Sequence, residues 1–375
     1  MKPTMCANAG DVLLCAAWGE GRERPKVTIV VPLYNAFAHV ENLLSQLDST
    51  SFIDAELVLV LDGPDHPVEE RLLKHEFKWP AVVVTLPTRA GVAVARNTAL
   101  KWATGNYVWF VDADDAWPGA ALTELANAAT PEIDIVIGRA TRHVIRSAES
   151  LPVSTPRAET LDQQLFLREL LNGRIEGYLW NKLIRASAFP SVGAFAPLRT
   201  KSDFYGVIGT LPAVRHAKAI PYHVYDYQFQ PGSISSATLS TPLDVFRVYE
   251  HLVGTLRTAG IKYRSHELAA FVVNTVGRVV IAETARYGDS AVNGVVALEY
   301  LHGVLSLKHA ISLLAHGRIK LFVLAVAMRF APGAVSSVYR LRHSRRWNIY
   351  PTTPATQGGQ SAHPTRAGGE GTARK

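Results

Sequence analysis

Cysteine is almost absent from this sequence of 375 residues, which has only Cys6 and Cys15, both near its start. Two such residues do not make the spaced cysteine framework of a small disulfide-stapled secreted domain. The only apolar stretch of the opening segment, from Val12 to Trp18, is too poorly flanked for a secretion signal. These absences favour a reducing cytoplasm, and we expect residues 1–25 to be an N-terminal extension.

Acidic residues are missing from a long C-terminal stretch. None lies between Glu299 and Glu370, whereas nine Lys and Arg residues do, and without those nine the net charge of +7 would be −2. The same stretch contains the apolar run Ile319 to Ala331, which is shorter than the roughly 20 residues of a membrane-spanning helix. Basic and apolar residues together favour an interfacial helix on an anionic membrane, with a core helix as the alternative. Nucleic acid is not expected, because stacking aromatics do not alternate with the charges.

Two phosphate-binding signatures are also missing. The chain has no G-x-x-x-x-G-K-[ST] sequence, so it is not a P-loop phosphotransferase. A sugar-nucleotide pyrophosphorylase, also an α/β enzyme with metal-binding acids, would usually show a glycine-rich loop with Arg or Lys near its N-terminus. Residues 32–40 begin with Pro-Leu-Tyr-Asn instead.

Apolar runs that alternate with helical periodicity predict an α/β fold with a mainly parallel sheet. The expected strands are 27–31, 56–61, 81–86, 107–111 and 133–137, and the expected helices are 38–47, 92–103 and 118–129.

Polar side chains follow three of these strands. Tyr34 and Asn35 follow the first, Asp62 follows the second, and Asp112 and Asp114 follow the fourth. Ligands of open α/β sheets bind at the carboxyl ends of the strands, so these groups are expected to converge. An aromatic ring can stack on a base, a lone carboxylate can accept from a base N–H, and a D-x-D sequence can hold a hard divalent cation. The N-terminus of the helix that opens after Arg89 would favour an anionic ligand.

In this combination and order, the residues resemble family 2 glycosyltransferases of the GT-A fold. The matching segments are Val27 to Asn35, Asp62-Gly63, Gly91 to Gly105 with Ala95-Arg96-Asn97, Phe110 to Asp115, Trp180-Asn181-Lys182, Tyr225-Asp226-Tyr227 and Pro231-Gly232-Ser233-Ile234-Ser235. The chain departs from the family pattern at Arg89, where Asn is usual, and at Leu61, which replaces the first of two acids.

The resemblance implies a GT-A domain over residues 26–236, with a Rossmann-like mixed sheet that binds a nucleotide-diphosphate sugar, most readily a UDP-sugar. The implied donor-binding residues are Pro32, Tyr34, Asn35, Asp62, Gly91, Arg96, Asn97, Asp112 and Asp114. Among them, Asp114 with the help of Asp112 would hold Mg²⁺ or Mn²⁺.

The catalytic base implied by the resemblance is Asp203, with Ser202 at the position where the family often has Glu. A carboxylate is needed there because an acceptor hydroxyl is a poor nucleophile until its proton is removed. Asp226 is a weaker candidate for the same role. Trp180, Asn181 and Lys182 would lie on the acceptor side, although Trp180 could simply pack the domain and Lys182, like Arg96, could be a structural ion-pair partner.

The remainder of the chain is expected to be a helical region over residues 237–346, which is a candidate for membrane association, and a disordered tail over residues 347–375. Helical spacing covers residues 244–258, 267–286, 292–307 and 309–326, and Thr, Pro, Gly, Gln and Ser dominate after Pro351.

The function expected from all of these features is an inverting, metal-dependent glycosyltransferase. It would act in cell-surface polysaccharide or glycolipid synthesis on a saccharide or lipid-linked acceptor, as a cytoplasmic protein on the inner face of the plasma membrane. The alternatives are a catalytically silent membrane-associated scaffold of the same fold and the pyrophosphorylase considered above.

Overall fold

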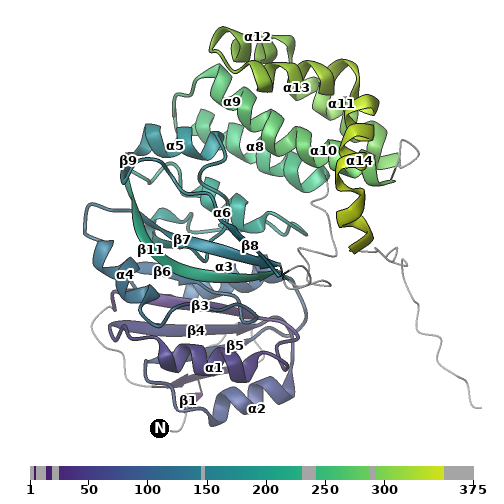
Figure 1. Cartoon of the computed structure of the whole chain (residues 1–375). Coiled ribbons are helices and arrows are strands. Elements are labelled where there is room, and N and C mark those ends of the chain that lie inside the picture. Colours follow the sequence, from purple (N-terminus) through teal and green to yellow (C-terminus); the bar gives the residue numbers. More distant parts are fainter. Residues whose placement is uncertain are drawn as a thin grey trace, which may run out of the picture.

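A mixed β-sheet with helices on both faces forms the first part of the molecule, and a helical region lies beside one of those faces (Figure 1). This computed structural model describes residues 4–5, 14–18, 25–144, 148–229, 242–287 and 292–349. The strand order is β1-β2-β5-β4-β3-β6-β10-β7-β11-β9, and β8 pairs with β7. Strands β5, β4, β3 and β6 run parallel, whereas β10 is antiparallel to both β6 and β7. The structure therefore confirms the predicted α/β fold with a mixed sheet.

The bounds of the strands are β1 (Thr4–Met5), β2 (Leu14–Trp18), β3 (Val27–Leu33), β4 (Ala55–Leu61), β5 (Ala81–Thr85), β6 (Tyr107–Phe110), β7 (Ile135–Val144), β8 (Glu149–Pro152), β9 (Thr160–Asp162), β10 (Lys182–Arg185) and β11 (His216–Phe229). The helices beside the sheet are α1 (Val40–Ser49), α2 (His66–Lys74), α3 (Val92–Trp102), α4 (Ala121–Ala128), α5 (Gln163–Leu171) and α6 (Ser202–Gly209).

All five predicted strands and all three predicted helices of this part are present, with ends that differ by at most three residues except at β7, which runs seven residues past its predicted end. The apolar stretch at the start of the chain forms β2, which extends the sheet by pairing antiparallel with β5. Helix α2 was not predicted. It begins with a proline in its first turn and with Asp65 as its N-cap, whose side chain accepts a hydrogen bond from the backbone N–H of Val68.

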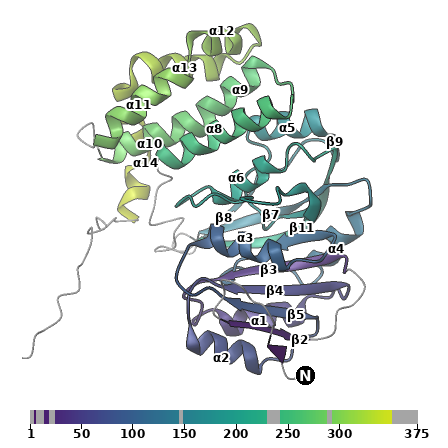
Figure 2. The same ribbon diagram turned by 180° about the vertical axis from the view of Figure 1, so that it is seen from behind.

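The two faces of the sheet bury different helices. One core packs α1, α2 and α4 against the sheet, and the other packs α3, α5 and α6 against it (Figure 2). Strand β6 lies in the middle, between β3 and β10, and every one of its residues is buried. Its apolar sequence Tyr-Val-Trp-Phe can fill both cores because neighbouring side chains of a strand point to opposite faces.

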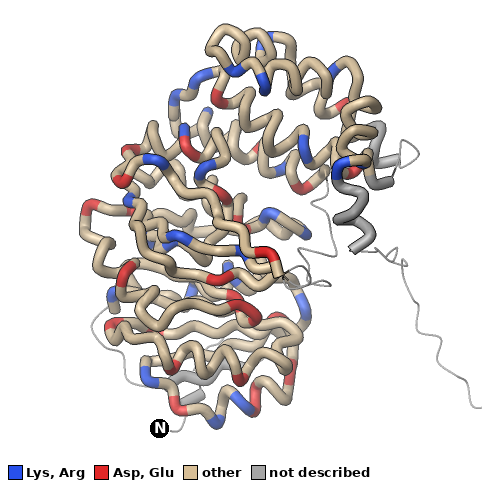
Figure 3. Tube along the Cα trace, viewed as in Figure 1, with Lys and Arg blue, Asp and Glu red and all other residues tan. Residues whose placement is uncertain are grey.

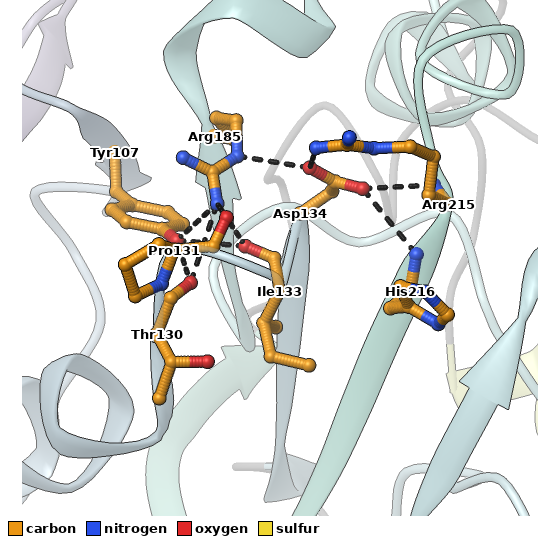
Figure 4. Close-up of polar contacts among 8 residues, drawn as sticks. All are labelled: Tyr107, Thr130, Pro131, Ile133, Asp134, Arg185, Arg215 and His216. Atoms are coloured by element: carbon orange, nitrogen blue, oxygen red, sulfur yellow. Dashed lines mark hydrogen bonds and ion pairs between the residues drawn. The ribbon is translucent and has the colours of Figure 1, made fainter.

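A buried ionic network ties the strands together at the edge where β6 begins (Figure 4). The guanidinium of Arg185 donates to the carboxylate of Asp134 at 2.9 Å and to the hydroxyl of Tyr107 at 2.7 Å. Asp134 also accepts from the backbone N–H groups of Arg215 and His216. Burial works to raise the pKa of Asp134, but these hydrogen bonds and the Arg185 charge hold it below its usual value. The network lies at the opposite ends of β6 and β7 from the ligand-binding edge, so we assign it a structural role.

The helical region contains α8 (Pro242–Thr258), α9 (Ser265–Phe271), the π-helix η2 (Val272–Gly277), α10 (Arg278–Tyr287), α11 (Val292–Val304), α12 (Leu307–Ala315), α13 (Ile319–Phe330) and α14 (Pro332–Ile349). It packs on the helices beside the sheet, through α8 against α6 and through α9 against α5. Helix α14 continues into the segment that was predicted to be a disordered tail, and residues 350–375 lie outside the described part of the chain.

The prediction of one continuous helix over residues 309–326 was wrong. The chain turns at Gly317, whose φ of 69° lies in the left-handed region that glycine adopts freely. The N–H of Gly317 donates to the carbonyl of Leu314, and the N–H of Arg318 donates to that of Leu313. This is the Schellman pattern, which ends α12 and starts α13 in a new direction.

Within the described residues, two helical stretches are apolar and long enough to cross a membrane by length and composition. One is Ser265–Ala285, of which 72% is buried in the protein, as in the core helix of a helical bundle. The other is the pair Ile319–Phe330 and Pro332–Arg342, which is bent by 114°.

Gly105 offers a test of how β6 is held. Its backbone N–H donates to the hydroxyl of Thr28 at 2.9 Å, and a Cβ there would lie 2.5 Å from the backbone nitrogen of Thr28. We expect Gly105→Ala to lower the free energy of unfolding by roughly 1–3 kcal/mol through overpacking. Gly254→Ala is the matched control in α8, because its Cβ would meet nothing within 4 Å and alanine favours a helix by about 1 kcal/mol. Urea denaturation measures both, and a Gly105→Ala protein as stable as wild type would contradict this packing.

Candidate active site

The turn after β6 is held to β11 by one tyrosine hydroxyl. Asp115 is 1% exposed, and its carboxylate accepts hydrogen bonds from the Tyr225 hydroxyl at 3.0 Å and from the backbone N–H of Gln228 at 2.7 Å. The Tyr225 oxygen in turn accepts from the backbone N–H of Asp112 at 2.9 Å. Both ends of the Asp112–Asp115 turn are therefore fixed, and Asp114 lies between them.

Three acidic residues predicted from the sequence influence one another electrostatically. Burial raises the pKa of Asp112, and the negative charges of Asp114 and Asp203 raise it further. Arg96 opposes this effect, with its guanidinium 3.3 Å from the Asp112 carboxylate. The fold thus brings residues from three separate segments to one place and leaves them with an excess of negative charge.

Asp62 stabilises the turn that leads into α3. One of its carboxylate oxygens accepts from the backbone N–H of Ala90 at 2.6 Å, and both accept from that of Gly91 at 2.9 Å. Gly91 has a φ of 93°, a value that a side chain would disfavour. The structure thus gives Asp62 a structural role at the N-terminus of α3, beside the role in base recognition that the sequence predicts.

The end of β3 presents an exposed aromatic ring. Tyr34 is 50% exposed, and the guanidinium of Arg89 lies 4.0 Å from the centre of its ring. Asn35 follows with a positive φ of 48°, which asparagine tolerates better than most residues. Pro32 occupies the register opposite Val60 near the end of β3. Arg89 stands where the family usually has Asn. It places a positive charge over the Tyr34 ring, on which we expect the nucleobase to stack.

The two polar residues in the first turns of α3 have different partners. Arg96 is buried and faces Asp112. Asn97 exchanges two hydrogen bonds with the backbone of Phe195, donating to its carbonyl at 2.8 Å and accepting from its N–H at 3.0 Å. Asn97 therefore fastens the segment that precedes the candidate base.

Asp203 stands in the first turn of α6, next to a strained residue. Lys201 has a φ of 67°, a left-handed conformation that non-glycine residues rarely adopt outside sites that require it. The side chain of Asp244, from the first turn of α8, accepts hydrogen bonds from the N–H and hydroxyl of Thr200. The helical region thus helps to place Asp203. Ser202, which is 4% exposed, leaves its hydroxyl without a hydrogen-bond partner in the described residues.

The three residues predicted on the acceptor side are buried. Trp180 is stacked between Tyr178 and Tyr225, with ring centres 4.5 and 4.7 Å away. Asn181 accepts from the ammonium of Lys182 at 2.8 Å. In this structure they support the partly exposed Tyr178, so any contact with an acceptor would be made through the loop that they hold.

Lys182 closes that loop from within. Its ammonium donates to the carbonyls of Glu176 at 2.9 Å and Tyr178 at 2.6 Å, and it is 1% exposed. Burial lowers its pKa to about 7, although the charges of Glu176 and Asp203 oppose the shift. The alternative that Lys182 is an ion-pair partner is not seen, because no carboxylate of the described residues pairs with it.

Sequence reasoning did not predict the roles of Asp115, Tyr225 and Asp244. Asp115 is the third acid of the turn and could have been suspected for that reason. Tyr225 lies in a segment that matches the family, but nothing in the sequence indicates that its hydroxyl contacts this turn. Asp244 carries no local signal. Asp226, the weaker candidate for the base, accepts a hydrogen bond from His143 at 2.7 Å, and the imidazole of His223 lies 3.0 Å from the same carboxylate. The motif Pro231 to Ser235 lies outside the described residues.

The buried lysine generates a prediction about stability and pH. Because the pKa of Lys182 is lower in the folded protein than the ordinary value of about 10.4, its buried charge costs stability below pH 7, and the cost disappears as the pH rises towards 10. Relative to Lys182→Met, wild type should gain stability across that window, by at most about 5 kcal/mol. Urea unfolding at pH 7, 8, 9 and 10 measures the difference, with Lys262→Met as the exposed control. A constant difference between wild type and Lys182→Met would show that the lysine is not perturbed.

Comparison with known proteins gives the site a context. Residues 28–193 match the family model described as glycosyl transferase family 2. The putative glycosyltransferase EpsH of Bacillus subtilis is 25% identical over 185 residues, which are 47% of this chain and 52% of EpsH. The Escherichia coli enzyme WfgD, a UDP-Glc:α-D-GlcNAc-diphosphoundecaprenol β-1,3-glucosyltransferase, is 33% identical over 92 residues, which are 24% of this chain and 37% of WfgD. The chain thus spans about half of EpsH and little more than a third of WfgD.

A solved structure extends the likeness beyond the matched domain. Residues 1–349 of Staphylococcus aureus TarS in complex with UDP-GlcNAc superpose with a TM-score of 0.68 at 20% identity, covering 84% of this chain and 92% of the TarS chain. At that identity the superposition shows a shared fold, which reaches into the helical region. Residues 28–193 therefore form a family 2 glycosyltransferase domain, and the molecule has the GT-A fold.

Proposed function

We propose that this protein transfers a sugar from a nucleotide-diphosphate sugar to an acceptor hydroxyl, with inversion at the anomeric carbon. The main support for this proposal is that Asp112, Asp114 and Asp203 lie close enough for the charges of the other two to act on Asp112. Arg96 is the cation beside them. A UDP-sugar is the favoured donor, since TarS was solved with UDP-GlcNAc and WfgD is named for UDP-Glc.

The donor would lie along the ends of β3, β4 and β6. The base would stack on Tyr34, with Arg89 against the ring as it is now and Asp62 accepting from a base N–H. Asp62 keeps capacity for that bond, because a carboxylate has about four acceptor sites and three short contacts to backbone N–H groups use only part of them. The N-terminus of α3 and the Arg96 guanidinium supply positive potential for the phosphates.

The turn Asp112–Asp115, which contains three aspartates, suits Mg²⁺ or Mn²⁺. Its carboxylates are oxygen ligands of the kind these ions prefer, and the pKa of Asp112 is raised by burial and by the neighbouring acids, a cost that a cation would remove. The described residues contain no group of three or more His, Cys, Asp or Glu side chains arranged as a complete metal site. Asp114 and Asp112 would therefore share the ion with the donor's phosphates. When bound, the ion would neutralise charge on the leaving nucleoside diphosphate.

The protein's own part in the reaction is to orient the acceptor and remove its proton. Asp203 would accept the acceptor's hydroxyl proton as the oxygen attacks the anomeric carbon from the face opposite the leaving group. Asn97 and Asp244 hold the segment that precedes Asp203, at Phe195 and Thr200, which helps to keep its carboxylate in position. The partly exposed Tyr178, stacked on Trp180, offers a flat surface for a sugar ring.

The role of the two acids is tested with a panel of nucleotide-sugars in the presence of Mn²⁺. We expect Asp114→Asn to abolish metal-dependent donor binding, and Asp203→Asn to bind the donor but to transfer sugar about 10²–10⁴-fold more slowly. Asp54→Asn is the control, because Asp54 is exposed just before β4, at the opposite edge of the sheet. Calorimetry measures binding, and release of nucleoside diphosphate measures turnover. If wild type binds no donor, the silent-scaffold alternative takes over; if Asp203→Asn turns over normally, Asp203 is not the base.

We also propose a cytoplasmic, peripheral location on the inner face of the plasma membrane, with a saccharide or lipid-linked acceptor in cell-surface polysaccharide or glycolipid synthesis. Helices α12 to α14 carry exposed apolar side chains, and α12 and α13 contain Lys and Arg but no Asp or Glu (Figure 3). The exposed apolar residues are Leu307, Ile311, Leu314, Ile319, Val323, Phe330, Val338 and Leu341. Apolar and cationic groups on the same helices are what an anionic lipid surface binds.

Two pairs of exposed apolar residues test the membrane proposal. We expect Val323→Ser/Phe330→Ser to weaken binding to phosphatidylglycerol-containing vesicles more than tenfold, because burying each such side chain is worth about 1.5–3 kcal/mol. The control pair Ile53→Ser/Val192→Ser is at least as exposed but lies on the transferase domain. Co-sedimentation measures the partition. If both double variants bind the vesicles as tightly as wild type, the exposed apolar residues of α13 do not bind the membrane.

A further inference from the structure

A cavity of about 540 Å³ lies where the helical region meets the transferase domain, apart from the donor and acceptor residues described above. Three elements form its wall: the turn after α5, the π-helix η2, and the start of α13. The residues that matter here are Asn172, Arg174, Asn274, Arg318, Ile319 and Lys320. Departures from α-helical geometry such as η2 occur frequently at functional sites.

The cavity has an excess of positive charge. Arg174 is neutralised by the buried carboxylate of Glu169, which accepts two of its hydrogen bonds. Arg318 instead donates to the neutral side chain of Asn172. Neither Arg318 nor Lys320 forms an ion pair with a carboxylate of the described residues. Burial lowers the pKa of Arg318, the charge of Glu267 opposes the shift, and the charge of Arg174 adds to it. An anion in the cavity would relieve this crowding of cations.

The first turn of α13 supports the same conclusion. Ile319, Lys320 and Leu321 are the first residues of this helix, and all three line the cavity. The N-cap residue is Arg318, whose guanidinium cannot accept a hydrogen bond, so the first backbone N–H groups of α13 receive no acceptor from the cap side chain. Free N–H groups at a helix start, together with the helix dipole, favour phosphate. The amides of Asn172 and Asn274 add neutral polar groups to the wall.

The rim of the cavity is apolar and open. Ile319 and Leu321 line it, and Ile319 is 61% exposed. A soluble phosphate would gain nothing from these side chains, whereas a phosphate on an apolar chain would bury them. We propose that this cavity is a second binding site, which takes the phosphate group of an anionic lipid. The cavity itself supports an anion, and the choice of a lipid rests on the membrane surface proposed above.

The test compares Arg318→Gln/Lys320→Gln with wild type. Binding is measured by co-sedimentation with vesicles of phosphatidylglycerol and phosphatidylcholine, with vesicles of phosphatidylcholine alone, and by calorimetry with inorganic phosphate. We expect the double variant to lose at least about tenfold in affinity for the phosphatidylglycerol vesicles, since hydrogen bonds to a charged group are worth about 1.5–3 kcal/mol. Lys101→Gln/Lys262→Gln removes the same charge from exposed positions outside both the cavity and α12 to α14, and should lose much less. Lys320→Gln alone, an exposed change, guards against misfolding of the double variant and should lose part of the affinity.

Three results would overturn the proposal. If both double variants lose the same affinity, only general charge attraction operates. If the cavity variants lose binding of inorganic phosphate but bind vesicles like wild type, the site takes a soluble phosphate and not a lipid. If they bind everything like wild type while Val323→Ser/Phe330→Ser loses vesicle binding, the membrane surface stands and the cavity has no part in it.

Discussion

The hydroxyl of Tyr225 is the contact on which the rest of the site depends. It joins β11 to the turn after β6, through one hydrogen bond to Asp115 and one from the backbone N–H of Asp112. Burial raises the pKa of Tyr225 far above its ordinary value, with the nearby charges of Asp115 and Asp112 adding to the effect, so it remains a hydrogen-bond donor. Tyr225 is also part of a stack of four aromatic rings, which are Trp117, Tyr225, Trp180 and Tyr178 in that order. The stack connects the turn after β6 to the partly exposed ring of Tyr178.

A second constraint is the shortage of positive charge beside the acids. Arg96 is the cation that contacts Asp112, and it faces the combined charge of Asp112, Asp114 and Asp203. Lys182 could have neutralised the charge of Asp203, but its ammonium donates all three of its hydrogen bonds to neutral oxygens. Burial lowers its pKa to about 7. Such an arrangement is unfavourable in the free protein, and under the proposed function a cation and a diphosphate would relieve it. The helical region contributes as well, because Asp244 of α8 holds the segment just before Asp203.

The parts of the fold that could be predicted from sequence are those with a local cause. Alternating apolar runs predict the strands, and strand ends predict where Tyr34, Asp62 and Asp112 lie. Contacts between distant segments could not be predicted, because nothing near Tyr225 or Asp244 in the chain indicates Asp115 or Thr200 as partners. The break between α12 and α13 was missed although Gly317 marks it, since the apolar periodicity continues across the glycine. Trp180, Asn181 and Lys182 match the family pattern, but only the structure shows that they are buried.

The proposed function requires the turn after β6 to hold a divalent cation and the donor's diphosphate together. A crystal of the protein grown with Mn²⁺ and a nucleoside diphosphate, with data collected at the manganese absorption edge, tests it most directly. The account predicts an anomalous peak within coordination distance of Asp114, beside Asp112, with the diphosphate between it and the start of α3. A nucleotide bound elsewhere, or a diphosphate at this edge with no manganese beside Asp114, would contradict it.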